Sequence, residues 1–227
     1  VNNAIQVSIN DSTAAWDNGY PSGGNYWSDY AGTDLHKGPS QNLTGSDGIG
    51  DTPYTCDENN VDNYPLMNPL VNLAITNVWS SKTAVGEGYK VYINVTMQNE
   101  GWNQQTTRLT VYVNTTVLST ISNLVLAPSS QVNMNFTWQT TTGARGTYII
   151  RAAVDSVPGE VDTGDNTRNA SQTVKVTIVG DVNGDGTVNI LDAIVISTAY
   201  SARPDSPNWN GNADINCDNV VNILDAI

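Results

Sequence analysis

The feature that most constrains this chain is a twelve-residue motif near its C-terminal end that occurs twice. Residues 181–192 are D-V-N-G-D-G-T-V-N-I-L-D, and residues 214–225 are D-I-N-C-D-N-V-V-N-I-L-D. The two copies begin 33 residues apart, and such a duplication indicates two equivalent structural units. Each copy has oxygen-bearing side chains at positions 1, 3, 5, 9 and 12, which is the ligand spacing of an EF-hand calcium loop.

Each motif predicts one calcium site, because calcium is a hard cation that binds about six to eight oxygen ligands. The position 7 ligand is a backbone carbonyl and the others are side chains. The expected ligands are Asp181, Asn183, Asp185, Thr187, Asn189 and Asp192 in the first loop, and Asp214, Asn216, Asp218, Val220, Asn222 and Asp225 in the second. Position 6 is Gly186 or Asn219, and both residue types tolerate a positive φ. Position 12 is Asp in both loops instead of the usual Glu.

Two such loops, each followed by an apolar helix start, resemble a type I dockerin over residues 179–227. The resemblance implies a small α-helical module with two calcium-binding halves and near two-fold symmetry. It also implies a cohesin-like partner, bound at loop positions 10 and 11, although a neighbouring copy of the chain is an alternative partner and packing between the halves is an alternative role. These positions are Ile190, Leu191, Ile223 and Leu224. Because the second copy ends two residues after its loop, we expect a piece of a longer protein.

The charge balance excludes nucleic acid as a partner. The chain has 9 Lys and Arg residues against 22 Asp and Glu residues, for a net charge of −13, and phosphate binding needs a basic face. No run of 18 apolar residues occurs, so we expect no membrane span in this sequence. Abundant Asn, Thr, Val and Gly favour strands and turns over helices.

Glycosylation sequons and calcium loops together favour an extracellular or cell-surface location. Six N-x-[ST] sequons occur, at Asn10, Asn42, Asn94, Asn114, Asn135 and Asn169. The two cysteines, Cys56 and Cys217, are too few for a disulfide framework. They are either unrelated thiols or one bridge, within the chain or between copies.

Residues 1–67 are irregular after one predicted strand at 1–9. The stretches G-Y-P-S-G-G-N-Y-W-S-D-Y (19–30), G-S-D-G-I-G-D-T-P-Y (45–54) and D-N-Y-P-L (62–66) resemble the C-terminal end of right-handed parallel β-helix proteins on archaeal cell surfaces. The resemblance implies a cap that closes a solenoid. We expect a small aromatic core formed by Trp16, Tyr20, Tyr26, Trp27, Tyr30, Tyr54 and Tyr64.

Two functional alternatives remain open for this segment. The aromatic residues are also suited to a sugar-binding platform. Asp47 and Asp51, with Asp29 and Asp34, are candidates for a third calcium ion. We expect no enzyme activity, since lyase chemistry on acidic sugars needs a Lys or Arg base and this segment has only Lys37.

Residues 68–178 alternate apolar and polar residues in short runs, which predicts an immunoglobulin-like antiparallel β-sandwich. Strands are expected at 74–79, 91–97, 109–113, 132–138, 147–154 and 173–179. The residues predicted to face the core are Ile75, Val91, Ile93, Val95, Leu109, Val111, Val113, Val132, Met134, Phe136, Trp138, Ile150, Val174 and Val176.

This sandwich resembles the cell-adhesion-related (CARDB-like) domain of prokaryotic surface proteins. The matching stretches are L-A-I-T-N-V (73–78), V-T-M-Q-N-E-G-W (95–102) and V-P-G-E-V-D-T-G-D-N-T (157–167). The resemblance implies a spacer or adhesion scaffold and no reaction. The acidic residues of the third stretch favour a hydrogen-bonded turn, with calcium binding as the alternative; they are Glu160, Asp162, Asp165 and Asn166.

The sequence therefore predicts a mainly β protein of three modules: a β-helix cap (1–67), an Ig-like sandwich (68–178) and a dockerin (179–227). The predicted function is that of an extracellular calcium-binding structural or adhesion protein that docks to partners. The alternative is the non-catalytic C-terminal part of a polysaccharide-active or carbohydrate-binding protein, with glycans as partners.

Overall fold

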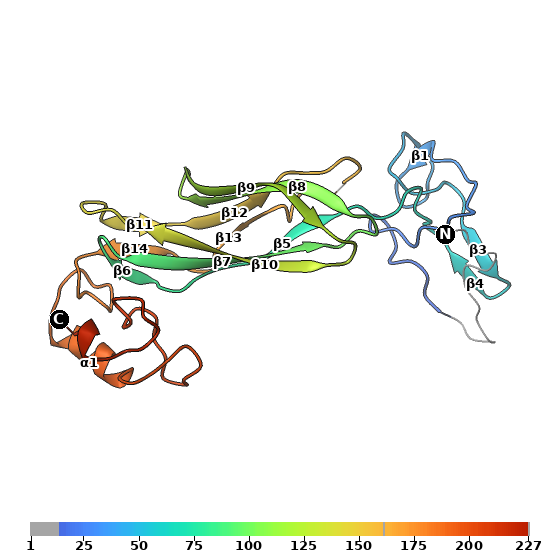
Figure 1. The fold of residues 1–227 in the computed structure, drawn as a ribbon. Coiled ribbons are helices and arrows are strands. Elements are labelled where there is room, and N and C mark those ends of the chain that lie inside the picture. The colour runs from blue at the N-terminus through green and yellow to red at the C-terminus, as the bar shows by residue number, and fades with distance from the viewer. Residues whose placement is uncertain (1–13, 161, 227) are drawn as a thin grey trace. The chain divides into compact units, whose positions relative to one another are not determined.

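The computed structural model describes residues 14–160 and 162–226, which form two compact units, 1–70 and 71–227 (Figure 1). The predicted strand at 1–9 and the sequon at Asn10 lie outside the described residues. The described residues are mainly β, as predicted.

Short hairpins and loops make up the described part of the first unit. Strand β1 (His36–Lys37) pairs with β2 (Leu43–Thr44), and β3 (Tyr54–Asp57) pairs with β4 (Asn60–Asp62), both antiparallel. Isolated bridges join Leu66 to Tyr26 and to Ile49. Residues 14–70 contain no stack of parallel strand rungs. The β-helix cap therefore stays a prediction.

A buried carboxylate and an aromatic cluster hold these loops together. Trp27 is buried and stacks on Tyr54 at a centroid separation of 4.4 Å, while Trp16 lies 5.7 Å from Trp27. The fully buried Asp62 accepts hydrogen bonds from the Trp27 indole nitrogen (2.8 Å) and from the Asn25 amide (2.7 Å). It also accepts a bond from the backbone amide of Tyr64. The predicted aromatic core is confirmed at these three rings and at Tyr30, whose ring lies 6.3 Å from Tyr54, whereas the predicted member Tyr20 is exposed.

Two sheets pack face to face in the second unit and form the predicted sandwich (Figure 1). One sheet has the order β10-β7-β5, from Gln131–Gln139, Lys90–Asn99 and Leu73–Ser80. The other has the order β13-β12-β8-β9, from Thr167–Asn169, Ile150–Val154, Gln105–Val113 and Thr116–Leu126.

A third, smaller sheet corrects the expectation of purely antiparallel pairing. Its order is β11-β14-β6, from Gly146–Tyr148, Val174–Thr177 and Ala84–Gly86, and β14 runs parallel to β6. The predicted strand 147–154 is divided between β11 and β12, which belong to different sheets. Period-two alternation identifies which residues face inward, but it carries no information on where a strand changes sheets.

The predicted core of the sandwich is confirmed. All fourteen predicted inward residues belong to its apolar cluster or pack against it; Val132, Met134 and Trp138 on β10 are only partly buried. The cluster also includes residues that the pattern missed, such as Leu73, Val78, Met97 and Leu126.

Strand β9 is the longest element that the sequence analysis missed. Its pairing with β8 shifts register twice, between Thr107 and Leu109 and between Val111 and Tyr112. Asn123 within β9 has a positive φ of 56°. A bulge reverses which residues face the core, so no continuous alternation runs through 116–126.

After the sandwich, the duplicated motifs form loops that lead into helix α1 (Ile190–Thr198) and the 3₁₀ turn η1 (Ile223–Asp225). A small apolar cluster joins the two halves of this module. It consists of Val182, Ile196, Ala199, Ala213 and Val221, with Val195, Trp209 and Ile215 packed against it. Within the described residues, the second motif ends in a single 3₁₀ turn, whereas the first leads into a full α-helix.

Replacing Ile93 by Ala should destabilise the sandwich by about 2–5 kcal/mol, because the fully buried side chain of β7 would leave a cavity. Urea denaturation measures the change. The neighbouring Tyr92→Ala is the matched control, since Tyr92 is on the same strand but exposed; it should stay within about 1 kcal/mol. Equal losses from the two variants would contradict the assignment of the core face.

Replacing Asp62 by Ala should destabilise the first unit, because three donors lose their acceptor. Each buried donor left without an acceptor lowers the free energy of unfolding by about 1–3 kcal/mol. Hydrogen exchange should accelerate at the Trp27 indole and at the Asn25 and Tyr64 amides. The control is Glu58→Ala, because Glu58 is exposed in the β3–β4 turn. Unchanged exchange in the Asp62 variant would show that this carboxylate does not organise the unit.

Candidate calcium-binding and docking site

The first duplicated loop folds its terminal carboxylates inward. Asp181 accepts hydrogen bonds from the backbone amides of Asp185 (3.0 Å) and Gly186 (2.8 Å). Asp192 accepts from the amides of Val182 (2.8 Å), Asn183 (3.1 Å) and Asn189 (2.9 Å). The residues at positions 1 and 12 therefore close the loop on itself.

The second loop repeats most of this geometry. Asp214 accepts from the amides of Asp218 (3.1 Å) and Asn219 (3.1 Å), which are the equivalents of Asp185 and Gly186. Asp225 accepts from the amides of Asn216 (3.2 Å) and Asn222 (2.8 Å). The two loops are thus structural equivalents, as the duplication predicted.

The last ligand positions of each loop also begin the following helix or turn. Asn189 caps α1 by accepting from the Leu191 amide (2.8 Å), and Asp192 completes a capping box by accepting from the Asn189 amide. Asn222 and Asp225 make the same box at η1. An Asp at position 12 reaches the amide of position 9 in this box, which gives a physical role to the residue that departs from the EF-hand pattern.

Position 6 of each loop has the predicted left-handed backbone. The φ angle is 98° at Gly186 and 67° at Asn219. Position 5 accepts a bond from the amide of position 7 in both loops, Thr187 to Asp185 (2.8 Å) and Val220 to Asp218 (2.9 Å). All the predicted ligand positions therefore lie in loops of the expected form.

The electrostatics of the loops favour a bound cation. The carboxylates at positions 1 and 12 belong to residues that are almost wholly buried, with exposed fractions of 2% for Asp181 and Asp192, 4% for Asp214 and 1% for Asp225. Burial raises the pKa of Asp214, Lys82 opposes the rise, and the charge of Asp225 adds to it. Burial also acts to raise the pKa of Asp192, but its three backbone hydrogen bonds hold that pKa below its usual value.

The donor set fits calcium rather than a softer metal, because it consists of oxygens only. Among residues 14–160 and 162–226, no group of three or more His, Cys, Asp and Glu side chains is arranged to hold a metal ion. Each loop instead mixes three carboxylates with two Asn side chains and a backbone carbonyl. The number of ions stays a prediction.

Both loops are held against the sandwich, which the sequence analysis did not foresee. Lys82, only 4% exposed, donates to the carbonyl oxygens of Asp214 and Ile215. Asn212 accepts from the amides of Thr83 (2.8 Å) and Ala84 (3.1 Å). In the sequence, the only indication of this contact is Lys82, which is one of few basic residues in an acidic chain.

The first loop is attached to strand β14. The Thr177 hydroxyl donates to Asp181 (2.5 Å), and the Lys175 ammonium donates to the Gly184 carbonyl (2.5 Å). Lys175 also acts to lower the pKa of Asp185, after the larger effect of the hydrogen bonds from Thr187 and Asn183.

The four predicted docking residues point outward. Their exposed fractions are 72% for Ile190, 52% for Leu191, 64% for Ile223 and 59% for Leu224. The alternative role, packing between the two halves, is therefore wrong for the described residues. Ile194, which is also exposed, follows Ile190 by one helical turn and extends this apolar face of α1.

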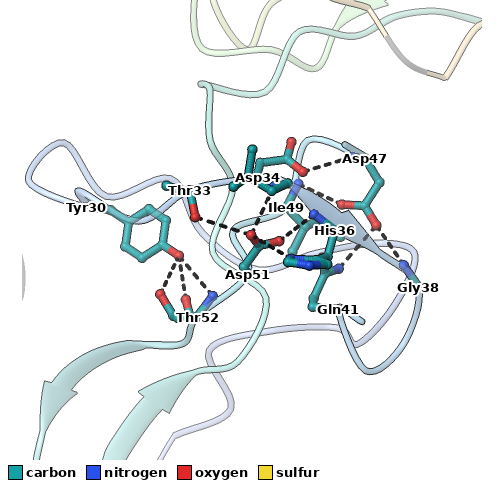
Figure 2. A network of polar contacts seen from close by, with 11 residues as sticks. Tyr30, Thr33, Asp34, His36, Gly38, Gln41, Asp47, Ile49, Asp51 and Thr52 are labelled. Atoms are coloured by element: carbon teal, nitrogen blue, oxygen red, sulfur yellow. Dashed lines mark hydrogen bonds and ion pairs between the residues drawn. The ribbon is translucent and has the colours of Figure 1, made fainter. Parts of the chain in front are cut away.

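The candidate third calcium site in the first unit is a network of hydrogen-bonded loops (Figure 2). Asp51 accepts from the backbone amides of Leu35 and His36, which lower its pKa. Asp34 accepts from the amides of Asp47 and Gly48, and Asp47 itself accepts from Gly38, Gln41 and Ile49. Asp29 bonds separately to the Tyr54 hydroxyl. These carboxylates serve loop closure, and the third ion near Asp47 and Asp51 stays a prediction.

Cys56 and Cys217 are both free thiols in this structure and belong to different units, and a bridge between them stays a prediction. The Cys217 sulfur lies 3.5 Å from the Lys90 carbonyl oxygen.

Four of the sequon asparagines are exposed, namely Asn42, Asn114, Asn135 and Asn169. Asn94 is half-buried, and its side-chain amide donates to Asn135 (2.9 Å). Glycosylation stays a prediction.

Comparison with known protein families assigns the two modules of the second unit. Residues 179–227 match the model of the dockerin type I domain, and residues 70–173 match the CARDB model. Comparison with curated proteins finds no match. Both domain types are typical of extracellular or cell-surface proteins, and a dockerin implies docking to cohesin partners. Within the described residues, every helix is too short or too polar to cross a membrane.

Solved structures with a similar fold include a CARDB domain from Pyrococcus furiosus, determined in complex with di-metal ions. That domain is 23% identical, with a TM-score of 0.42, and the match covers 48% of this chain and 94% of the domain. A β-glucosidase from Listeria innocua in complex with glucose is 11% identical, with a TM-score of 0.34; the match covers 54% of this chain and 19% of the enzyme. Residues 70–173 of this chain are thus similar to the CARDB family, and residues 179–227 are similar to type I dockerins.

Proposed function

We propose that this chain is an extracellular structural or adhesion protein that docks, in its calcium-loaded state, to a cohesin-like partner through the apolar residues that follow each loop. The observation that carries the proposal is the hydrogen-bond geometry that the two loops share. Each encloses two buried carboxylates and ends in a capping box that presents an exposed Ile-Leu pair.

Calcium supplies positive charge beyond that of Lys82 and Lys175, the two lysines that contact these loops. Burying like charges close together is unfavourable, and backbone amides offset only part of that penalty. The ion pairs found among the described residues involve His36, Arg108 and Arg145, which lie outside both loops. A divalent cation bound by oxygens would offset the remaining repulsion.

Docking through Ile190, Leu191, Ile223 and Leu224 is supported by their exposure. Apolar side chains that protrude together are typical of surfaces that a partner covers. Because the loops are equivalent, each half presents a similar Ile-Leu pair, and a neighbouring copy of the chain is the alternative partner. The sandwich serves as a scaffold that holds both loops, and in this proposal the described residues catalyse no reaction.

The calcium assignment predicts that Asp192→Asn weakens calcium binding to the first loop by at least about tenfold, or about 1.4 kcal/mol. Asn keeps one oxygen for the Val182 and Asn183 amides, removes the acceptor of the Asn189 amide, and removes the ligand charge. Isothermal titration calorimetry should find one strong site fewer in Asp192→Asn, and two fewer when Asp225→Asn is added.

Asp205→Asn is the control, since Asp205 is exposed between the two loops. With free calcium at about 1,000 times Kd, removal by EDTA should lower the stability of residues 179–226 by about 4 kcal/mol for each site. Identical titrations for the native chain and the double variant would refute the calcium assignment.

The docking assignment predicts that Ile190→Ser with Leu191→Ser weakens association on the order of 100-fold. Each apolar side chain contributes about 1.5–3 kcal/mol when a partner buries it. Surface plasmon resonance against immobilised cohesin domains measures partner binding, and analytical ultracentrifugation measures self-association. Trp79→Ser is the control, because Trp79 is an exposed apolar residue on β5. If the double variant keeps every association of the native chain, the docking surface is misassigned.

A further inference from the structure

A second polar cluster lies at one end of the sandwich, apart from the duplicated loops. It joins Asn72, just before β5, to Glu100, just after β7, and to Asp165, in the segment between β12 and β13. The Asn72 amide nitrogen lies 3.1 Å from Glu100 Oε2 and 3.3 Å from Asp165 Oδ2. One amide group thus lies between two carboxylates from different parts of the sandwich.

Three side-chain oxygens in this cluster are buried and have no hydrogen-bond partner within the described part of the chain: Asn72 Oδ1, Asp165 Oδ1 and Asn166 Oδ1. Asn72 and Asn166 are only 7% and 5% exposed. Leaving a buried oxygen without a partner costs about 1–3 kcal/mol, and more for a charged group. Buried oxygens without a partner need an explanation, and a bound ion or water molecule is one.

A neighbouring carboxylate explains why these oxygens stay in place. Glu160 accepts from the backbone amide of Leu73 (2.7 Å), from that of Val157 (3.0 Å) and from the Asn166 side chain (3.1 Å). Glu160 therefore links the acidic loop (the stretch 157–167) to the start of β5. The hydrogen-bonded turn that was predicted for this loop is present. Both Glu160 oxygens are used, so Glu160 is a positioning residue for the cluster.

The cluster carries negative charge that no basic side chain balances. Glu100, Asp162 and Asp165 form no salt bridge to a described cation. Burial raises the pKa of Asp165, and although the Asn72 hydrogen bond opposes this, the charges of Asp162 and Glu100 add to the rise. Arg168 donates to the Ile75 carbonyl (3.4 Å) and not to these carboxylates.

We propose that this end of the sandwich binds a calcium ion through Asp165, Glu100 and Asn72. The amide nitrogen of Asn72 lies between the two carboxylates, where a cation would be attracted equally to both. Rotating the amide by half a turn about its last side-chain bond presents Oδ1 there instead. The ligands then comprise two carboxylates and one amide oxygen, with water completing the shell that calcium prefers. The ion would join the ends of β5 and β7 to the acidic loop.

The first test compares calcium stoichiometry in full-length variants. In Glu100→Gln with Asp165→Asn, which keep shape and remove charge, equilibrium dialysis should find one bound calcium ion fewer per chain. Asp155→Asn is the matched control, because Asp155 belongs to the same domain and pairs with Arg108 (2.8 Å) away from the cluster; it should keep the native number. An unchanged number in the double variant overturns the proposal. A similar loss in the Asp155→Asn control also overturns it, because the loss is then not specific to the cluster.

The second test uses Asn72→Asp and does not depend on the double variant folding normally. A third carboxylate should destabilise the sandwich in EDTA, and calcium should restore it, so that its calcium-induced rise in Tm exceeds that of the native chain. If Asn72 only donates hydrogen bonds to the turn, the variant loses the same stability with and without calcium. That result would overturn the proposal.

Discussion

The interaction on which this structure depends is the hydrogen bond between a carboxylate and backbone amides. Asp62 holds the aromatic cluster of the first unit, and Asp51 closes its loops. Glu160 joins the acidic loop to β5, and Asp181, Asp192, Asp214 and Asp225 close the duplicated loops. A carboxylate accepts several such bonds at once, so each one fixes an irregular segment that no strand ladder supports.

This use of carboxylates follows from the charge of the chain. With 22 acidic and only 9 basic residues, most carboxylates have no Lys or Arg to pair with. Surface carboxylates remain hydrated, but the buried ones must be stabilised by amides or by a cation. The proposed calcium sites lie where amides alone leave charge or oxygens unsatisfied, in the duplicated loops and at the end of the sandwich.

The sandwich does more than separate two modules, because it also positions the dockerin loops. Lys82 is buried at the junction and donates to the backbone of the second loop, while Thr177 and Lys175 hold the first. These contacts orient the Ile-Leu pairs relative to the sandwich. A partner that binds them would therefore engage a surface that is already ordered on its scaffold, which lowers the entropy lost on binding.

The sequence by itself determined the positions of the duplicated loops, the sandwich core and the mainly β class. These depend on local chemistry: fixed ligand spacing, positive φ at Gly186 or Asn219, and apolar alternation in the strands. Only the tertiary structure decided that Ile190 and Leu191 face outward, that β14 pairs parallel to β6, and that β9 joins the sheet despite two bulges. It also brought together Asn72, Glu100 and Asp165, which lie as many as 93 residues apart. Such contacts depend on how distant strands pack, and no local pattern encodes that arrangement.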